Sequence, residues 1–156
     1  MEKEIRSEDV LVASMDSIYP LIKESLENGK SVRLSPKGSS MLPMIRQGID
    51  TVTLSPIDRP LKKYDIPLYL RDDGKYVLHR IVKAGEEYTC IGDNQFAKEC
   101  GLRKEQMLAV VTSFTRGQKE YTVSDASYRV YCILWHNTRF ARRLLRAVIR
   151  RLKRMF

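Results

Sequence analysis

The sequence contains few residues of the kinds that build metal sites or disulfide frameworks. It has two histidines and three cysteines in 156 residues, and Cys90, Cys100 and Cys132 form no CxxC pair and have no histidine at metal-ligand spacing. An odd number of separated cysteines is typical of reduced thiols in a cytosolic protein. We therefore expect neither a disulfide scaffold nor a metal or other cofactor.

Long hydrophobic runs are also missing. No stretch approaches the roughly 18 consecutive apolar residues of a membrane-spanning helix, and residues 1–6 open into a charged segment without the apolar stretch of a signal peptide. We expect a cytoplasmic protein that is at most peripheral at the cytoplasmic membrane. The composition, 43% hydrophobic and 30% charged, is that of a globular protein, and the length fits one domain.

Acidic residues are absent from one end of the chain. Residues 139–156 hold eight Lys or Arg and no Asp or Glu, whereas residues 1–138 hold 20 cations and 19 acids. The net charge of +9 therefore divides into a nearly neutral body and a cationic tail, and the tail decides which partners the charge could attract.

The tail has the pattern of a basic amphipathic helix, because its apolar residues keep helical spacing while its arginines occupy the other face. Such a helix can bind an anionic membrane surface, or it can pack on the body with its arginines in water. Nucleic acid binding is disfavoured, since the segment has only two aromatic residues and no groove-reading motif. The membrane-surface candidates are Arg142, Arg143, Arg146, Arg150, Arg151 and Arg154.

The whole chain divides into a helical segment (1–30), a β domain (31–124) and a C-terminal region (125–156) that includes the cationic tail. Apolar residues at helical spacing predict a helix over 7–28 that ends at Gly29 and is kinked or divided at Pro20. From residue 31 onward, short runs with a period of two predict an antiparallel barrel or sandwich. The predicted strands are 31–35, 50–54, 65–71, 75–83, 87–92, 107–116 and 119–124, with a hairpin turn at Asp73-Gly74.

Three short motifs could carry chemistry. His79 lies among apolar residues of a strand, where an imidazole faces solvent, is satisfied by a buried hydrogen bond, or acts as a base. Ser39 and Ser40 follow a glycine in a turn that exposes hydroxyls, as ordinary turn serines do and as a nucleophile must. Asp93, in a Gly-Asp-Asn turn, could stabilise that turn or orient an imidazole.

The order of these motifs is more specific than any one of them. Read together, these motifs make the chain resemble the type I signal peptidase branch of the signal-peptidase and LexA-like serine peptidases, from Leu34 to Val111. The matching segments are GSSMLP (38–43), GIDTVTL (48–54), KKYDIPLYL (62–70), VLHRIV (77–82) and IGDN (91–94). The resemblance implies a mainly β fold, namely the antiparallel β-barrel of that superfamily, between the two helical ends.

The resemblance also implies roles for individual residues. Ser40 matches the nucleophile because it directly precedes Met41, and His79 matches the base of the members that use histidine in place of lysine. Ser39 would help to bind the oxyanion, and Asp93 would be the acid of the triad, with Glu99 as the second candidate.

The implied activity is that of a serine endopeptidase that cleaves a signal or leader peptide. Two departures concern turns: Gly48-Ile49-Asp50 has one residue more than the family pattern, and Tyr64 replaces a glycine. A catalytically inactive binding module, held to a membrane or a partner by its basic helix, is the alternative.

Overall fold

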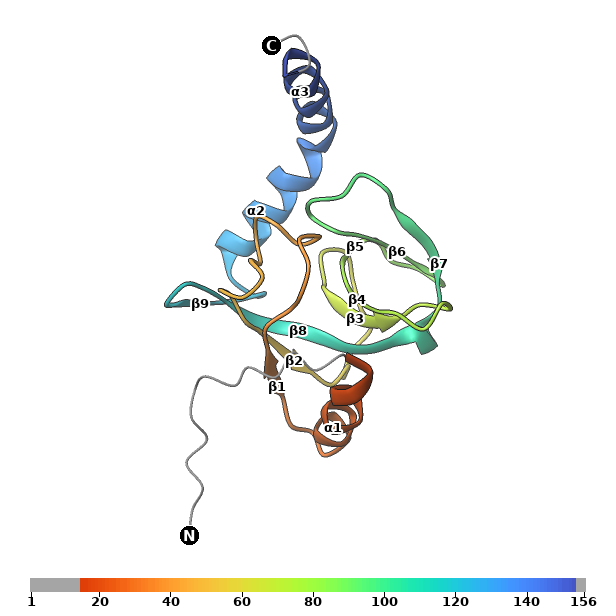
Figure 1. Cartoon of the computed structure of the whole chain (residues 1–156). Helices are drawn as coiled ribbons and strands as arrows, with labels where there is room; N and C mark the ends of the chain where they lie inside the picture. Colours follow the sequence, from red (N-terminus) through yellow and green to blue (C-terminus); the bar gives the residue numbers. More distant parts are fainter. Residues whose placement is uncertain (1–14, 154–156) are drawn as a thin grey trace.

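The computed structural model describes residues 15–153, which form an N-terminal helix, two antiparallel sheets and two C-terminal helices (Figure 1). The helices are α1 (Met15–Glu27), α2 (Ala126–Asn137) and α3 (Arg139–Leu152), with a short 3₁₀ helix η1 (Lys104–Gln106). The strands are β1 (Val32–Leu34), β2 (Val52–Ser55), β3 (Pro67–Leu70), β4 (Tyr76–Leu78), β5 (Arg80–Lys83), β6 (Tyr88–Ile91), β7 (Glu99–Leu102), β8 (Met107–Arg116) and β9 (Lys119–Thr122).

The strands form two sheets that do not close into a barrel within residues 15–153. One sheet has the order β1-β2-β8-β3-β4, with β9 also paired to β8, and the other has the order β5-β6-β7. The expected mainly β barrel is therefore corrected to a mixed fold with 30% helix and 29% strand. The predicted strand 75–83 is divided at His79, where β4 ends in the first sheet and β5 begins in the second.

The turn residues predicted the hairpins more accurately than the period-two pattern of apolar residues predicted the strands. The Asp73-Gly74 turn joins β3 to β4: Gly74 has a φ of 80° and donates its N–H to the Arg71 carbonyl at 3.0 Å. Strand β7 was not predicted, because its sequence does not alternate and it contains Gly101.

Helix α1 is one continuous helix where it is described. Pro20 lies inside it without dividing it into two helices, and the predicted residues 7–14 lie outside the described part of the chain. The predicted end at Gly29 is confirmed: Gly29 has a φ of 72°, and the next N–H, of Lys30, bonds to the Ser25 carbonyl at 2.9 Å. This is the usual glycine-terminated helix end.

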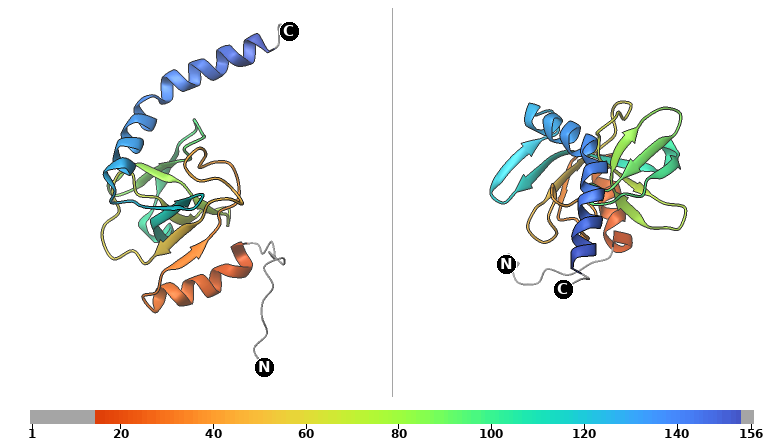
Figure 2. Two further views of the ribbon diagram at one scale, coloured as in Figure 1. Left: turned by 90° about the vertical axis from the view of Figure 1, so that its left-hand side faces the viewer. Right: turned by 90° about the horizontal axis from the view of Figure 1, so that it is seen from above.

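Two hydrophobic cores hold the sheets in place. The larger lies between α1, the first sheet, α2 and the segment between β1 and β2, and the smaller joins β3, β5, β6, β7 and β8. Helix α3 contributes no buried residue and extends away from the sheets, at the opposite end of the molecule from α1 (Figure 2). The three cysteines are free.

Candidate active site

Ser40 lies in the long connection between β1 and β2, which is anchored by its apolar side chains. Met41, Met44 and Ile45 each have 4% or less of their surface exposed and belong to the larger core. Ser40 itself is half-buried, and Ser39 is exposed. Burial of the residues that follow the serine explains why a turn without regular structure holds Ser40 in one place.

Asp50 fixes the other end of this connection. Its carboxylate is fully buried and accepts hydrogen bonds from the Arg46 Nε and Nη2 atoms and from the backbone N–H of Gly117, all within 2.9 Å. The hydrogen bonds from the Arg46 side chain are the main cause that lowers the pKa of Asp50 to about 2. Ile49 is exposed at the preceding turn and takes no part in the core.

The Gly92-Asp93-Asn94 turn supports the backbone of the two serines. The Asn94 N–H donates to the Ser40 carbonyl at 2.8 Å, and the Asn94 amide donates to the Ser39 carbonyl at 3.1 Å. A Cβ atom at Gly92 would lie only 2.7 Å from the Ser40 carbonyl oxygen, so this close approach requires glycine.

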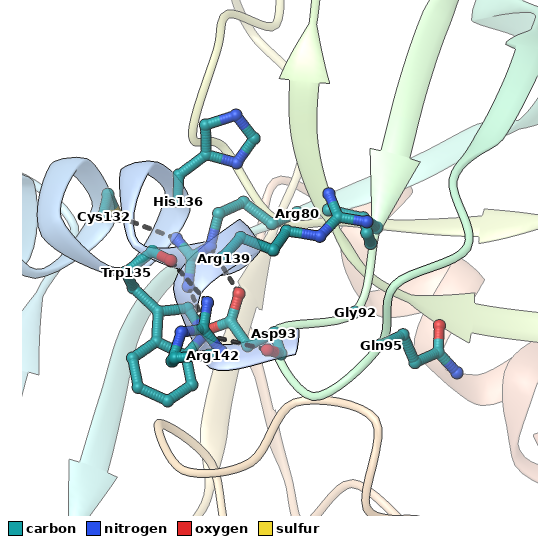
Figure 3. A pocket seen from close by; sticks show the side chains of 10 residues that line it. Arg80, Gly92, Asp93, Gln95, Cys132, Trp135, His136, Arg139 and Arg142 are labelled. Carbon is teal, nitrogen blue, oxygen red and sulfur yellow. Dashed lines mark hydrogen bonds and ion pairs between the residues drawn. The ribbon is translucent and has the colours of Figure 1, made fainter. Parts of the chain in front are cut away.

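The structure does not bring Asp93 to His79. The Asp93 carboxylate binds the Arg80 Nε and Nη2 atoms, each at 2.8 Å (Figure 3). It also accepts a hydrogen bond from Tyr131 of α2 at 3.0 Å. Arg80 and Asp93 are both buried, and Trp135 donates its indole N–H to the Asp93 carbonyl. The expected acid of the triad therefore forms a buried ion pair that joins the turn to α2.

Glu99, the second candidate, is the carboxylate beside His79. The distance from Glu99 Oε1 to His79 Nδ1 is 3.0 Å. Because an ionised carboxylate can only accept a hydrogen bond, Nδ1 carries the proton and Nε2 is left as the basic nitrogen. His79 is only 3% exposed and lies at the break between β4 and β5.

Two further residues, Tyr69 and Arg71, complete this cluster and were not predicted from the sequence. Arg71 forms a two-point ion pair with Glu99, with its Nε 2.7 Å from Oε2. The Tyr69 hydroxyl lies 3.2 Å from His79 Nδ1. Since alternate residues of an extended segment share a face, the i, i+2 spacing of Tyr69, in β3, and Arg71, directly after it, was the available signal.

The cluster sets the charges of its members. Burial works to raise the pKa of Glu99, but the hydrogen bonds from Arg71 and Tyr69 and the nearby positive charge outweigh it and lower that pKa. Burial is the main cause that lowers the pKa of His79, against the opposing effect of Glu99. A neutral imidazole beside an ionised carboxylate is the state that a general base needs.

Ser40 and His79 line the same cleft, which has a volume of about 230 Å³. Its other lining residues are Pro36, Lys37, Gly38, Met41, Ile45, Arg71, Tyr76, Val77, Leu78 and Gln95. Among the described residues, no hydrogen bond joins the Ser40 hydroxyl to the His79 imidazole. Ser39 does not line the cleft, although its carbonyl is fixed by Asn94.

Tyr64 has a backbone conformation that favours glycine. Its φ is 79°, and it is the one non-glycine residue with positive φ among residues 15–153. Its N–H bonds to the Ile81 carbonyl at 2.8 Å, and its own carbonyl accepts a hydrogen bond from Tyr128 of α2. These two hydrogen bonds hold the turn with tyrosine at a position of positive φ.

The C-terminal arginines fall into two groups. Arg142 stacks on Trp135, 3.5 Å from the ring centre, and Arg146 donates to the Asn94 side chain at 2.7 Å, so both contact the body. Arg143, Arg150 and Arg151 are exposed. Arg154 lies outside the described residues.

Two classes of site are not found in the part of the chain that the structure describes. No helix in residues 15–153 has both the length and the apolar character to cross a bilayer. Those residues also contain no group of three or more His, Cys, Asp or Glu side chains that could hold a metal ion.

No protein-family model, curated protein or solved structure matches the chain.

Proposed function

We propose that the protein is a serine endopeptidase of the signal-peptidase type, with Ser40 as nucleophile and His79 as general base. The observation that carries the proposal is the shared cleft: Ser40 and His79 line it together, and Glu99 Oε1 lies 3.0 Å from Nδ1 of His79. The ordered motifs from residue 38 to residue 94 support the same assignment.

The proposed reaction needs only these groups and water. The Ser40 hydroxyl attacks the carbonyl carbon of the peptide bond while His79 Nε2 accepts its proton. His79 returns the proton to the leaving amine as the C–N bond breaks, and water then hydrolyses the acyl ester on Ser40 by the same route. Glu99 keeps the imidazole oriented and stabilises its positive charge during each transfer.

The cleft also indicates the form of the substrate. One of its walls is β4, which is the last strand of the first sheet and has an unpaired edge within the described sheet. An extended peptide can bind to such an edge through main-chain hydrogen bonds. The family resemblance favours a signal or leader peptide with small residues before the cleaved bond, processed by a soluble or peripheral enzyme.

The test uses a mixture of synthetic peptides with small residues at varied positions, with cleavage products identified by mass spectrometry. We expect the wild-type protein to cleave a subset of them, and Ser40→Ala and His79→Ala to abolish that cleavage while keeping the thermal unfolding transition. Ser39→Ala is the matched control, since Ser39 lies outside the cleft, and it should keep most of the activity.

Each result decides between the enzyme and the binding module. Cleavage that survives in Ser40→Ala or His79→Ala would overturn the mechanism. Binding of a peptide by the wild-type protein and by Ser40→Ala with equal affinity, without cleavage by either, would establish the inactive binding module instead.

A further inference from the structure

Helix α3 exposes an apolar face that the described part of the chain leaves uncovered. Its six large apolar side chains are each between 43% and 71% exposed, and none of its residues is buried. They are Phe140, Leu144, Leu145, Val148, Ile149 and Leu152. Their i, i+4 and i, i+3 spacing places them on one side of the helix. A continuous exposed apolar face of this kind indicates a binding surface.

The charge around this face is of one sign. Helices α2 and α3 contain no Asp or Glu, and α3 carries six arginines in 14 residues. Of these, Arg143, Arg146, Arg150 and Arg151 are exposed, and Arg146 also bonds to the Asn94 side chain. The partner of this surface must therefore combine an apolar interior with negative charge at its boundary.

This charge pattern argues against a second copy of the same helix as the partner. Packing two such apolar faces together would bring the arginines of both copies close to one another with no acid on either helix to neutralise them. An anionic bilayer meets both requirements, because acyl chains accept the apolar residues and headgroups neutralise the arginines.

We propose that α3 is a docking helix that binds to the surface of an anionic lipid bilayer. The apolar face lies in the boundary between headgroups and acyl chains, and Arg143, Arg150 and Arg151 contact the headgroups. Binding is reversible and depends on salt. This surface is separate from the proposed peptidase cleft, so either assignment can fail without the other.

The start of α3 is fixed to the body beside the candidate active site. Arg146 donates to the Asn94 side chain at 2.7 Å, and the Asn94 N–H holds the Ser40 carbonyl at 2.8 Å. Arg139 also bonds to the Phe96 carbonyl. A protein docked through α3 therefore keeps its cleft close to the membrane, where a membrane-bound peptide is accessible.

The experiment measures sedimentation of the full chain with vesicles. One set contains phosphatidylcholine alone, and the other contains about one third phosphatidylglycerol. We expect binding to the anionic vesicles alone, weakening as salt rises. The variant Arg143→Gln/Arg150→Gln/Arg151→Gln should lower the partition coefficient about 100-fold. Leu145→Ser/Ile149→Ser should also lose binding without loss of the fold, since neither residue is buried.

The matched control is Lys30→Gln/Lys83→Gln/Lys104→Gln, which removes three exposed cations outside α3. It should keep nearly full binding if α3 is the docking site. An equal loss in the control, equal binding to neutral vesicles, or unchanged binding of the arginine variant would overturn the proposal. Binding to a duplex oligonucleotide without binding to anionic vesicles would assign the surface to nucleic acid instead.

Discussion

At the scale of single residues, the two candidate acids have different partners. Glu99 contacts His79 and Arg71 and is partly exposed, whereas Asp93 is buried against Arg80. A carboxylate that orients a base affects the rate of the reaction, and a carboxylate in a buried ion pair affects the stability of the fold. The two substitutions should therefore have different effects.

We expect Glu99→Gln to lower kcat/KM by about 100-fold or more with a change of only about 1 kcal/mol in the free energy of unfolding. Asp93→Asn should lower the free energy of unfolding by about 3 kcal/mol, because it leaves the buried Arg80 without its counter-charge. Urea unfolding and peptide cleavage, measured on both variants, check this. The reverse pattern would restore Asp93 as the orienting acid.

The pH dependence tests the same pair of residues. His79 must be neutral to accept a proton, and burial lowers its pKa, so kcat/KM should rise with pH with a midpoint below the ordinary value of about 6.5. The charge of Glu99 raises that pKa, so Glu99→Gln should move the midpoint to lower pH. If the midpoint is the same in the wild-type protein and in Glu99→Gln, Glu99 does not act on the His79 imidazole as the structure indicates.

Tyr64 offers a test of backbone strain. Both Tyr64→Gly and Tyr64→Ala remove the ring, but only glycine adopts a φ of 79° without cost. We expect Tyr64→Gly to be more stable than Tyr64→Ala by about 1 kcal/mol, measured by thermal unfolding. Equal stability of the two variants would mean that the turn relaxes.

At the scale of elements, the Gly-Asp-Asn turn holds the serine loop. We expect Gly92→Ala to lower kcat/KM at least about 10-fold, because a Cβ 2.7 Å from the Ser40 carbonyl must displace Ser40, the proposed nucleophile, or the turn. Gly85→Ala is the matched control, since its Cβ would meet no atom closer than 3.8 Å. Equal activity of the two variants would show that the contact at Gly92 is not needed.

The elements also show what the sequence could predict. Alternation and turn residues were sufficient for the hairpins and for most strands, because these depend on neighbours along the chain. The break at His79 depends on the division of one run between the two sheets, and β7, whose sequence does not alternate, depends on its pairing with β6. Local patterns do not contain that information, so they could not show which carboxylate, that of Asp93 or that of Glu99, reaches the imidazole.

At the scale of the whole molecule, the charge and the candidate chemistry are divided between two regions. The body holds the cleft with Ser40 and His79, and α3 holds the exposed apolar and cationic surface. The proposed peptidase and the proposed docking helix are therefore separable. The arginine variant should cleave a soluble peptide at the wild-type rate, which a cleavage assay without vesicles checks.

The most direct measurement of the central claim is mass spectrometry of the protein after brief incubation with a p-nitrophenyl ester of a short peptide. The account predicts release of p-nitrophenolate and an acyl group on Ser40, with no adduct in Ser40→Ala and much slower formation in His79→Ala. An adduct on another residue, or equal acylation of His79→Ala and the wild-type protein, would contradict it.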